Sequence, residues 1–538
     1  MTPSPAPPPA CTVCAVKPVR RLRASLLRAG RGAGLLLLSL LSGALACGPP
    51  PRKADLIVAV EQEPASLDPR VGSDVAADRA FRLLYRGLFA VGPDFSPQTD
   101  LAETWTFEDP QRLRVVLRAG VRFSDGRPLR ARDAAFTIRS ILRDDPPSFR
   151  KGDLDCIEAV EAVDDLTLVF RLKEPRAALL SALNVGILPE GTEAGAFVPV
   201  GCGPYRLRSW TRGQWLLFEA NPFASPAPSS ATLAFKVVPD PVVRALELRR
   251  GTVDLVVNDL PPDALARFAD LGYRVWRAPG ANFAYVGFNC SRPPLNRAEV
   301  RRALSLSLDR GAIIRHVLRG YAREAAGLLP PEHWASVPLP PPGRDLAAAD
   351  ALLDESGLPR GRDGVRFRIT YKTSDNKISR QIASVVAENL REVGVDCRTQ
   401  WLEWGTFYGD VKRGDFDAFG LTWVGVTDPD GLRLRYASWA VPPLGFNRGR
   451  YANAELDGLL AAGSREMNPD LRRPLYVRAQ EILAREVPAA PLWHADAVCV
   501  ALRDVEGVVL PPDGNFSFLS GVRRRVPAQE RSGSSRLP

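Results

Sequence analysis

Apolar residues in the second half of the chain recur first at alternate positions, then at helical spacing, then at alternate positions again. Residues 365–371 and 395–401 alternate apolar with polar side chains, and residues 378–393 place apolar ones three and four positions apart. The pattern predicts a β-α-β unit, whose strands should be parallel and joined by a right-handed crossover. Upstream, Asn296 followed by Glu299 is typical of a capping box and predicts a helix beginning after Asn296.

The first half of the chain has the pattern of a sheet-rich region. Residues 56–60 form a continuous apolar run that predicts a buried strand, and residues 113–117 and 166–172 have the β-branched and aromatic content of further strands. Residues 77–88 predict an amphipathic helix. The proline-rich residues 326–345 predict a loop. Strands and helices mixed in this way indicate an α/β fold.

Residues 401–430 have the composition of a loop that contacts a ligand. The residues concerned are Trp404, Trp423, Gly425, Thr427 and Asp428. Aromatic rings offer a large contact area at low entropic cost, and small polar residues can orient a ligand. Ligands of open α/β sheets bind at the carboxyl ends of strands, and this stretch follows such an end. The alternative is a core tryptophan followed by a turn at Asp428 and Pro429.

The net charge of +10 lies at the two ends of the 538-residue chain. The first 46 residues contain six basic residues and no acid, and residues 523–538 contain five arginines and one glutamate. Residues 47–522 are therefore neutral overall. Nucleic-acid binding needs a basic face on the folded part, so we expect no nucleic-acid partner.

The N-terminus has the pattern of an export signal. Basic residues precede a short apolar run, and small residues then lead to Cys47. The pattern predicts a lipoprotein-type signal peptide over residues 1–46, a lipid on Cys47 and a tether over residues 47–51. The alternative is an ordinary secretory signal with a chance cysteine. Residues 523–538 are expected to form a basic, disordered tail.

The cysteines and histidines give no pattern for a metal or cofactor site. Five widely spaced cysteines follow Cys47, and their odd number leaves at least one thiol free. The three histidines are scattered and share no ligand spacing with the cysteines. The motifs of serine hydrolases and zinc proteases are also absent from the sequence. We therefore expect no metal, no cofactor and no catalytic residues.

A series of short motifs, in a fixed order along nearly the whole mature chain, resembles bacterial extracellular solute-binding proteins of the oligopeptide, dipeptide and nickel type, family 5. Each motif is weak alone, but their shared order is specific. The motifs lie at residues 64–69, 84–89, 101–105, 117–126, 201–205, 287–289, 300–304, 309–310, 423–430, 451–457 and 488–492. Asn447, between residues 430 and 451, also fits the series.

The resemblance implies an α/β, two-lobed periplasmic-binding-protein fold with an extra inserted domain and a hinge. Mapped onto this chain, lobe I takes residues 52–75, 196–280 and 491–522, the inserted domain residues 76–195, and lobe II residues 281–490. The hinge crossings are then expected near residues 281–289 and 488–494. Such proteins close around their ligand by hinge motion.

The resemblance also implies the function and partners. The protein would be a monomer that captures a small solute, such as a peptide or peptide-like compound, and delivers it to an ABC permease in the membrane. Lipid anchoring would hold it on the periplasmic side of the membrane, or on the outer face of a cell with one membrane. The ligand-binding set is expected to include Tyr285 and Asn289 besides the residues of the 401–430 stretch.

One position departs from the family pattern. In peptide-binding relatives an aspartate three residues after the second tryptophan pairs with the free amino group of the ligand, and here that residue is Val426. A buried ammonium group without a carboxylate is costly, so Val426 argues against a free peptide amino terminus bound in that way. Asp428 and Asp430 either substitute for the missing carboxylate or only stabilise a turn.

Other functions compete with peptide import. The solute could instead be a metal chelate, a sugar derivative or an opine-like compound. A lipoprotein sensor that presents its loaded form to a receptor kinase is a further alternative, and a secreted hydrolase is the least supported one. Sequence alone does not separate import from sensing.

Overall fold

The computed structural model describes residues 53–525 except 144–145, 149, 195–197 and 426. The predicted signal peptide, the tether, Cys47, Val426 and residues 526–538 of the predicted tail lie outside the described residues. Arg523 and Arg524, which the sequence analysis assigns to that tail, form strand β19, paired with β18 (Val505–Glu506).

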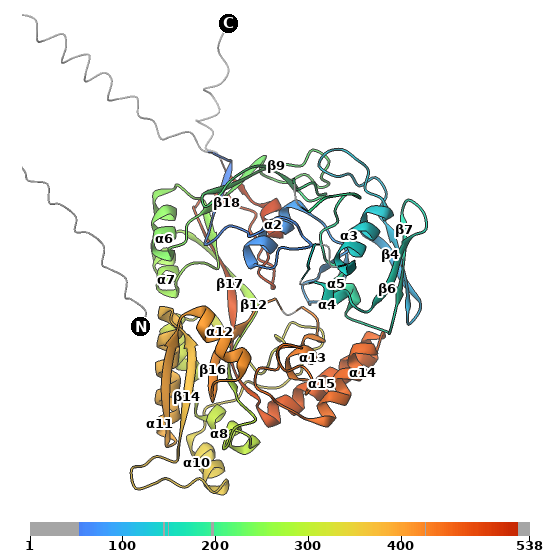
Figure 1. Ribbon diagram of the computed structural model, residues 1–538. Coiled ribbons are helices and arrows are strands. Elements are labelled where there is room, and N and C mark those ends of the chain that lie inside the picture. Colours follow the sequence, from blue (N-terminus) through green and yellow to red (C-terminus); the bar gives the residue numbers. More distant parts are fainter. Residues whose placement is uncertain (1–52, 144–145, 149, 195–197, 426, 526–538) are drawn as a thin grey trace, which may run out of the picture. The chain divides into compact units, whose positions relative to one another are not determined.

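An eleven-stranded sheet is the largest element of the molecule (Figure 1). Its strand order is β15-β14-β16-β12-β17-β11-β1-β10-β9-β8, with β13 paired to β17. The strands are β1 (Leu56–Val60), β8 (Tyr205–Thr211), β9 (Trp215–Ala220), β10 (Thr232–Val237), β11 (Leu255–Val257), β12 (Arg274–Phe288), β13 (Ala322–Glu324), β14 (Phe367–Ser374), β15 (Val395–Leu402), β16 (Ala418–Trp423) and β17 (Ala489–Ala501).

The predicted β-α-β unit is confirmed. β14 and β15 pair in parallel, and α11 (Lys377–Glu392) connects them. In β14, Ile369 and Tyr371 are two positions apart and both buried, as a half-buried strand requires. The predicted buried strand at residues 56–60 is also confirmed as β1, which lies between the parallel strands β10 and β11.

β12 and β17 are the two longest strands and pair with each other in antiparallel fashion along their length. On one side β12 pairs with β16, and on the other β17 pairs with β11. Both predicted hinge crossings fall within these two strands. Their register shifts between Ala278 and Asn282 and again between Ala284 and Tyr285.

A separate four-stranded antiparallel sheet, in the order β4-β5-β7-β6, lies within residues 76–195, the expected inserted domain. Its strands are β4 (Ala102–Asp109), β5 (Arg112–Leu117), β6 (Ile157–Ala162) and β7 (Thr167–Leu172), and its helices are α3 (Ala131–Arg143), α4 (Lys151–Leu154) and α5 (Leu179–Ala182). The core of this domain runs from Leu88 to Cys202. The short strands β2 (Phe89–Val91) and β3 (Pro97–Thr99) form a hairpin beside it.

The remaining helices cover the large sheet. They are α2 (Val75–Leu84), α6 (Pro241–Arg250), α7 (Pro262–Asp270), α8 (Ala298–Ser307), α9 (Arg310–Ala312), the π-helix η1 (Ile313–Val317), α10 (Leu346–Glu355), α12 (Trp404–Arg413), α13 (Gly431–Tyr436), α14 (Ala454–Arg465), α15 (Pro469–Glu486) and the 3-10 helix η2 (Ser517–Gly521). Figure 1 shows α14 and α15 lying side by side.

Each lobe has apolar cores of its own. In lobe I the side chains of α2 pack with those of β1 and β10, so α2 belongs to the core of that lobe and not to the inserted domain. In lobe II one cluster lies between α8, α11 and the sheet, and another lies between α12, α15 and the sheet. Among the helices of the described ranges, none has both the length and the apolar composition needed to cross a bilayer.

Candidate functional site

Trp423, the last residue of β16, is the centre of an aromatic wall on lobe II. Its register partner in β12 is Phe283. Tyr285, two residues after Phe283, lies on the same face of the sheet, and its ring is parallel to the indole with 6.0 Å between the ring centroids. Phe446 meets the indole edge to face at 5.8 Å. Alternate residues of neighbouring strands share one face of a sheet, so β12 and β16 position these rings together.

Two arginines outside the predicted ligand-binding set lie over this indole. The guanidinium carbon of Arg435, near the end of α13, is 4.2 Å from the centre of the Trp423 ring. That of Arg448, in the segment between α13 and α14, is 4.0 Å away. Both distances are within the range of cation–π interactions.

The hydrogen-bond partners of both guanidinium groups are neutral. Arg448 donates from Nη1 to the hydroxyl of Tyr285 and from Nη2 to that of Tyr408, both at 3.1 Å. Arg435 donates from Nη1 to the carbonyl oxygen of Gly431 at 2.8 Å, and its Nε has no acceptor. Within the described ranges, neither arginine forms an ion pair with a carboxylate.

The surroundings of Arg435 disfavour its charge. Burial is the main cause that lowers the pKa of Arg435 to about 10, and the positive charge of Arg448 contributes to this lowering. The weaker attractions of Tyr436, Tyr285 and Asp153 oppose this lowering. Arg435 is nevertheless half-buried rather than fully buried, and it borders a small cavity.

The stretch predicted to be a loop is mostly helix and strand. Glu403 caps α12 by accepting a hydrogen bond from the Thr406 amide, and β16 follows that helix. Only the residues between β16 and α13 lie outside regular structure. Gly425 in this loop is exposed and has a φ of 71°, a conformation that glycine adopts without strain.

The two predicted tryptophans lie in different surroundings. The Trp404 side chain at the start of α12 is 55% exposed, whereas that of Trp423 is 9% exposed. The Trp404 ring lies parallel to that of Tyr408 at 5.5 Å, and the Tyr408 hydroxyl contacts Arg448. Tyr408 and Arg448 thus connect the two indoles.

Asp428 is held in a polar cluster that joins lobe II to the inserted domain. Its carboxylate pairs with Arg472 of α15 at 2.7 Å and accepts a hydrogen bond from the Ser181 hydroxyl of α5 at 3.2 Å. It also accepts one from the Asp430 amide at 2.8 Å. Burial alone would raise the pKa of Asp428, but the charge of Arg472 holds it below its usual value. Thr427, the preceding residue, is half-buried.

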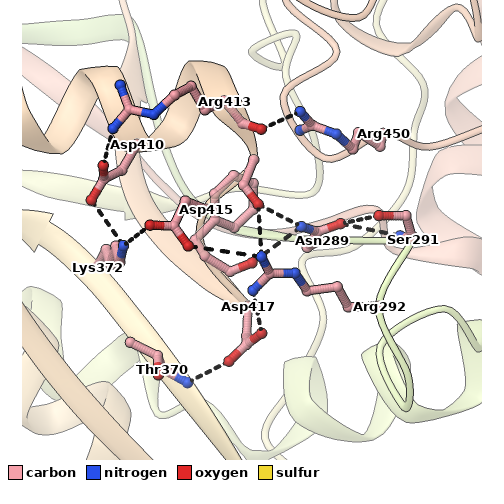
Figure 2. A network of polar contacts seen from close by, with 12 residues as sticks. Asn289, Ser291, Arg292, Thr370, Lys372, Asp410, Arg413, Asp415, Asp417 and Arg450 are labelled. Atoms are coloured by element: carbon pink, nitrogen blue, oxygen red, sulfur yellow. Dashed lines mark hydrogen bonds and ion pairs between the residues drawn. The ribbon is translucent and has the colours of Figure 1, made fainter.

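Asn289 lies at the end of β12 in a second polar network (Figure 2). Its side-chain amide donates to the carbonyl oxygens of Gly414 and Phe416, at 3.2 and 3.1 Å, and its oxygen accepts from Ser291. In the same network the buried Lys372 pairs with Asp410 at 2.8 Å. These contacts tie the end of β12 to the segment after α12, and they occupy the polar atoms of Asn289.

Further contacts close the inserted domain onto lobe II. Phe95, at the tip of the β2-β3 hairpin, is almost fully buried and stacks on His333 with 5.4 Å between ring centroids. The Trp334 amide donates to the Asp94 carbonyl oxygen at 3.0 Å, and the Ala177 amide donates to that of Ser464 at the same distance. These contacts join the inserted domain to lobe II.

A cavity of about 560 Å³ lies between lobe I and the inserted domain. Its charged lining includes Asp78, Arg82, Arg150 and Asp513. A smaller cavity of about 20 Å³ lies on lobe II and is bordered by Trp423, Arg435 and Arg448, among others. No group of residues in the described part of the chain could hold a metal ion.

A signal for the two arginines was present in the sequence. Residues 431–452, directly after the candidate loop, contain four arginines and no acidic residue. An acid-free arginine cluster next to an aromatic ligand loop could have indicated a site for an anion. Nothing in the spacing of these arginines showed that two of them would meet on Trp423.

A two-lobed α/β fold with an inserted domain and a hinge defines a class of extracytoplasmic binding proteins that close around a solute. The model of the bacterial extracellular solute-binding proteins, family 5, matches residues 96–440. The chain belongs to this family, and it is a substrate-binding protein of an ABC importer.

Individual relatives agree with this assignment. The chain is 31% identical to Protein XP55 of Streptomyces lividans, over 86% of this chain and 88% of that protein. It is 27% identical to the glutathione-binding protein GsiB of Salmonella typhimurium, over 89% and 96%. Among solved structures, the oligopeptide-binding protein AppA of Bacillus subtilis in complex with a nonapeptide superposes with a TM-score of 0.72 at 24% identity, over 88% and 99% of the two chains.

Proposed function

We propose that this protein captures a peptide or peptide-like solute between its lobes and delivers it to a membrane permease. The observation that carries the proposal is the hydrogen bond from Ser181 to Asp428. Through it, the loop that follows Trp423 takes part directly in closure of the inserted domain onto lobe II. A solute that contacts this loop in the closed form would stabilise closure by its differential affinity for that form.

The contact surface we propose is the wall around Trp423. Trp423 and Tyr285 supply the stacked rings, Trp404 an exposed indole nearby, and Gly425 and Thr427 the backbone of the loop. We assign Asp428 and Asn289 a structural role next to this wall rather than direct ligand contact, because their polar atoms already have protein partners.

The cavity of about 560 Å³ between lobe I and the inserted domain has a volume typical of small-ligand sites, and we propose that it receives the part of the solute that faces away from lobe II. Asp153 of α4 lies within electrostatic range of the wall. It lies three residues from Arg150, which lines the cavity, and its charge acts on Arg435. The peptide character of the solute is supported by the names of two relatives, one a glutathione-binding protein and the other solved with a nonapeptide.

The cellular setting that we propose is inferred from the amino-acid sequence. The protein would act as a monomer without catalytic activity, outside the cytoplasm, and a lipid on Cys47 would hold it near the permease. Loss of membrane association in a Cys47→Ser variant would be the direct check of the anchor.

The function is tested by native mass spectrometry of the purified protein, before and after addition of an equimolar tripeptide mixture. We expect a bound solute, and we expect Trp423→Leu to weaken binding of the best tripeptide by about tenfold because the stacking surface is lost. Trp439→Leu, which removes another indole that carries an arginine (Arg433), is the matched control and should bind normally. Equal loss in both variants, or binding of no peptide, would reject this function.

A further inference from the structure

The two guanidinium groups on Trp423 are an arrangement that the protein alone does not stabilise well. Arg435 and Arg448 carry like charges, contact the same indole and receive no carboxylate from the described residues. A charge removed from water without a counter-charge is unfavourable, and a second charge beside it adds repulsion. The attraction of each cation to the ring offsets only part of this cost.

Other arginines of the same region have acidic partners. Arg433, on the same helix as Arg435, pairs with Asp430 at 3.1 Å and also lies over Trp439. Arg472 pairs with Asp428 at 2.7 Å. Cation–π contact at this site therefore does not require an unpaired arginine. Among the described residues Arg450 also lacks a carboxylate, but its Nη2 donates to the carbonyl oxygen of Arg413 at 2.6 Å.

Donor groups remain available on both side chains. A guanidinium group has five N–H donors, and the hydrogen bonds described above use two of Arg448 and one of Arg435. The buried Nε of Arg435 has no acceptor. The adjoining cavity of about 20 Å³ exceeds the roughly 10–15 Å³ that one water molecule needs, so it accommodates one small polar group and not a whole solute.

We propose that the solute presents a carboxylate to Arg435 and Arg448 against the Trp423 ring. The planar, forked donors of arginine match a carboxylate, which would supply the missing counter-charge. The inference rests on the proposed function and specifies its ligand. A peptide would bind with its carboxyl end at Trp423, where the resemblance places the amino end in peptide-binding relatives.

The first experiment compares three forms of the tripeptide that binds best: the free acid, the N-acetylated form and the C-terminal amide. By isothermal titration calorimetry we expect acetylation to have little effect and amidation to lower affinity at least about tenfold, the value of one charge-assisted hydrogen bond. Arg448→Gln should lower the affinity for the free acid by a similar factor and should hardly change the affinity for the amide. The opposite result, with acetylation abolishing binding and amidation neutral, would overturn the proposal.

Arg433→Gln is the matched control, because it removes a cation–π arginine of the same helix that already has a carboxylate. It should leave the acid-to-amide ratio unchanged. A change in that ratio as large as the one in Arg448→Gln would also count against the proposal.

A second experiment separates this inference from the proposed function. Thermal unfolding is followed with millimolar succinate or citrate against sodium chloride of equal ionic strength. We expect the carboxylates to raise Tm in the wild type and not in Arg435→Gln/Arg448→Gln. Carboxylate stabilisation without peptide binding would keep the anion site and reject the peptide function. If instead peptides bind equally well with and without C-terminal amidation, and carboxylates do not raise Tm, the peptide function is kept and the anion site is rejected.

Discussion

Two arginine sites within lobe II have opposite electrostatic surroundings. Arg472 pairs with the buried Asp428, and although burial alone would lower its pKa, this carboxylate raises it. Arg435 has no such partner, and burial lowers its pKa to about 10. Both side chains lie against aromatic rings, so the difference comes from the carboxylate.

The comparison separates a support from a binding surface. At Arg472 the protein supplies both charges, and their pairing connects α15, the loop after Trp423 and the inserted domain. At Arg435 and Arg448 it supplies one sign of charge only. In the proposal above, an anion from the solute supplies the other sign of charge, which distinguishes these two arginines from a structural ion pair.

The largest expected effect comes from breaking the Arg472–Asp428 ion pair, the complete pair of this comparison. Arg472→Gln leaves Asp428 buried without a counter-charge, which should lower the free energy of unfolding by about 3–5 kcal/mol. Urea denaturation measures this. Arg465→Gln, which removes an exposed arginine paired with Glu174 at 3.3 Å, is the control and should cost less than about 1 kcal/mol. Similar losses in the two variants would show that the Arg472 pair is not the support we describe.

A smaller effect is expected from protonating the histidine beside the complete pair. Burial lowers the pKa of His333 to about 4, while Asp428 and Asp94 raise it and Arg472 lowers it. Because the folded state prefers the neutral form, unfolding takes up a proton below pH 6.5, and stability falls as the pH falls from 6.5 towards 4.

Urea unfolding between pH 6 and 4.5 checks this for His333→Gln against the wild type. Over that range the free energy of unfolding of the wild type should fall by about 2 kcal/mol more than that of the variant. This is close to the pH dependence expected when unfolding takes up one proton. His494, whose pKa burial also lowers to about 4, remains in both proteins and cancels in the difference. Parallel pH profiles would contradict the expectation.

The smallest effect is expected at the incomplete site. Arg435→Gln removes a cation–π contact worth roughly 0.5–1 kcal/mol but also removes repulsion from Arg448, so the free energy of unfolding should change by less than about 1 kcal/mol in either direction. Urea denaturation without ligand measures it. A loss comparable with that of Arg472→Gln would mean that Arg435 is structural.

Much of the fold could be predicted because its signals are local. The alternation in β14 and β15 and the helical spacing in α11 were read correctly, as was the proline-rich loop between Glu324 and Leu346. Boundaries were less certain. The cap predicted at Asn296 is wrong, since α8 begins after Arg297, which makes no side-chain cap. Several residues near that point could start a helix, and tertiary packing decides among them.

The candidate site could be predicted only in part, because it depends on contacts between distant segments. Trp423 and Tyr285 were selected from sequence, and the structure stacks them. Whether Asp428 faces a ligand depends on Arg472, 44 positions further on, and the importance of Arg448 depends on its meeting Trp423. No spacing rule within either segment contains that information.

The long β12-β17 ladder gives the hinge an elastic character. Both strands continue through the predicted crossings while paired to each other. If the hinge lies there, we expect opening of the lobes to bend and twist a hydrogen-bonded ribbon. Compliance is expected where the register shifts between Ala278 and Asn282, because ladder hydrogen bonds are interrupted at a bulge. The restoring force of that ribbon would then set how quickly an emptied receptor returns to its resting shape.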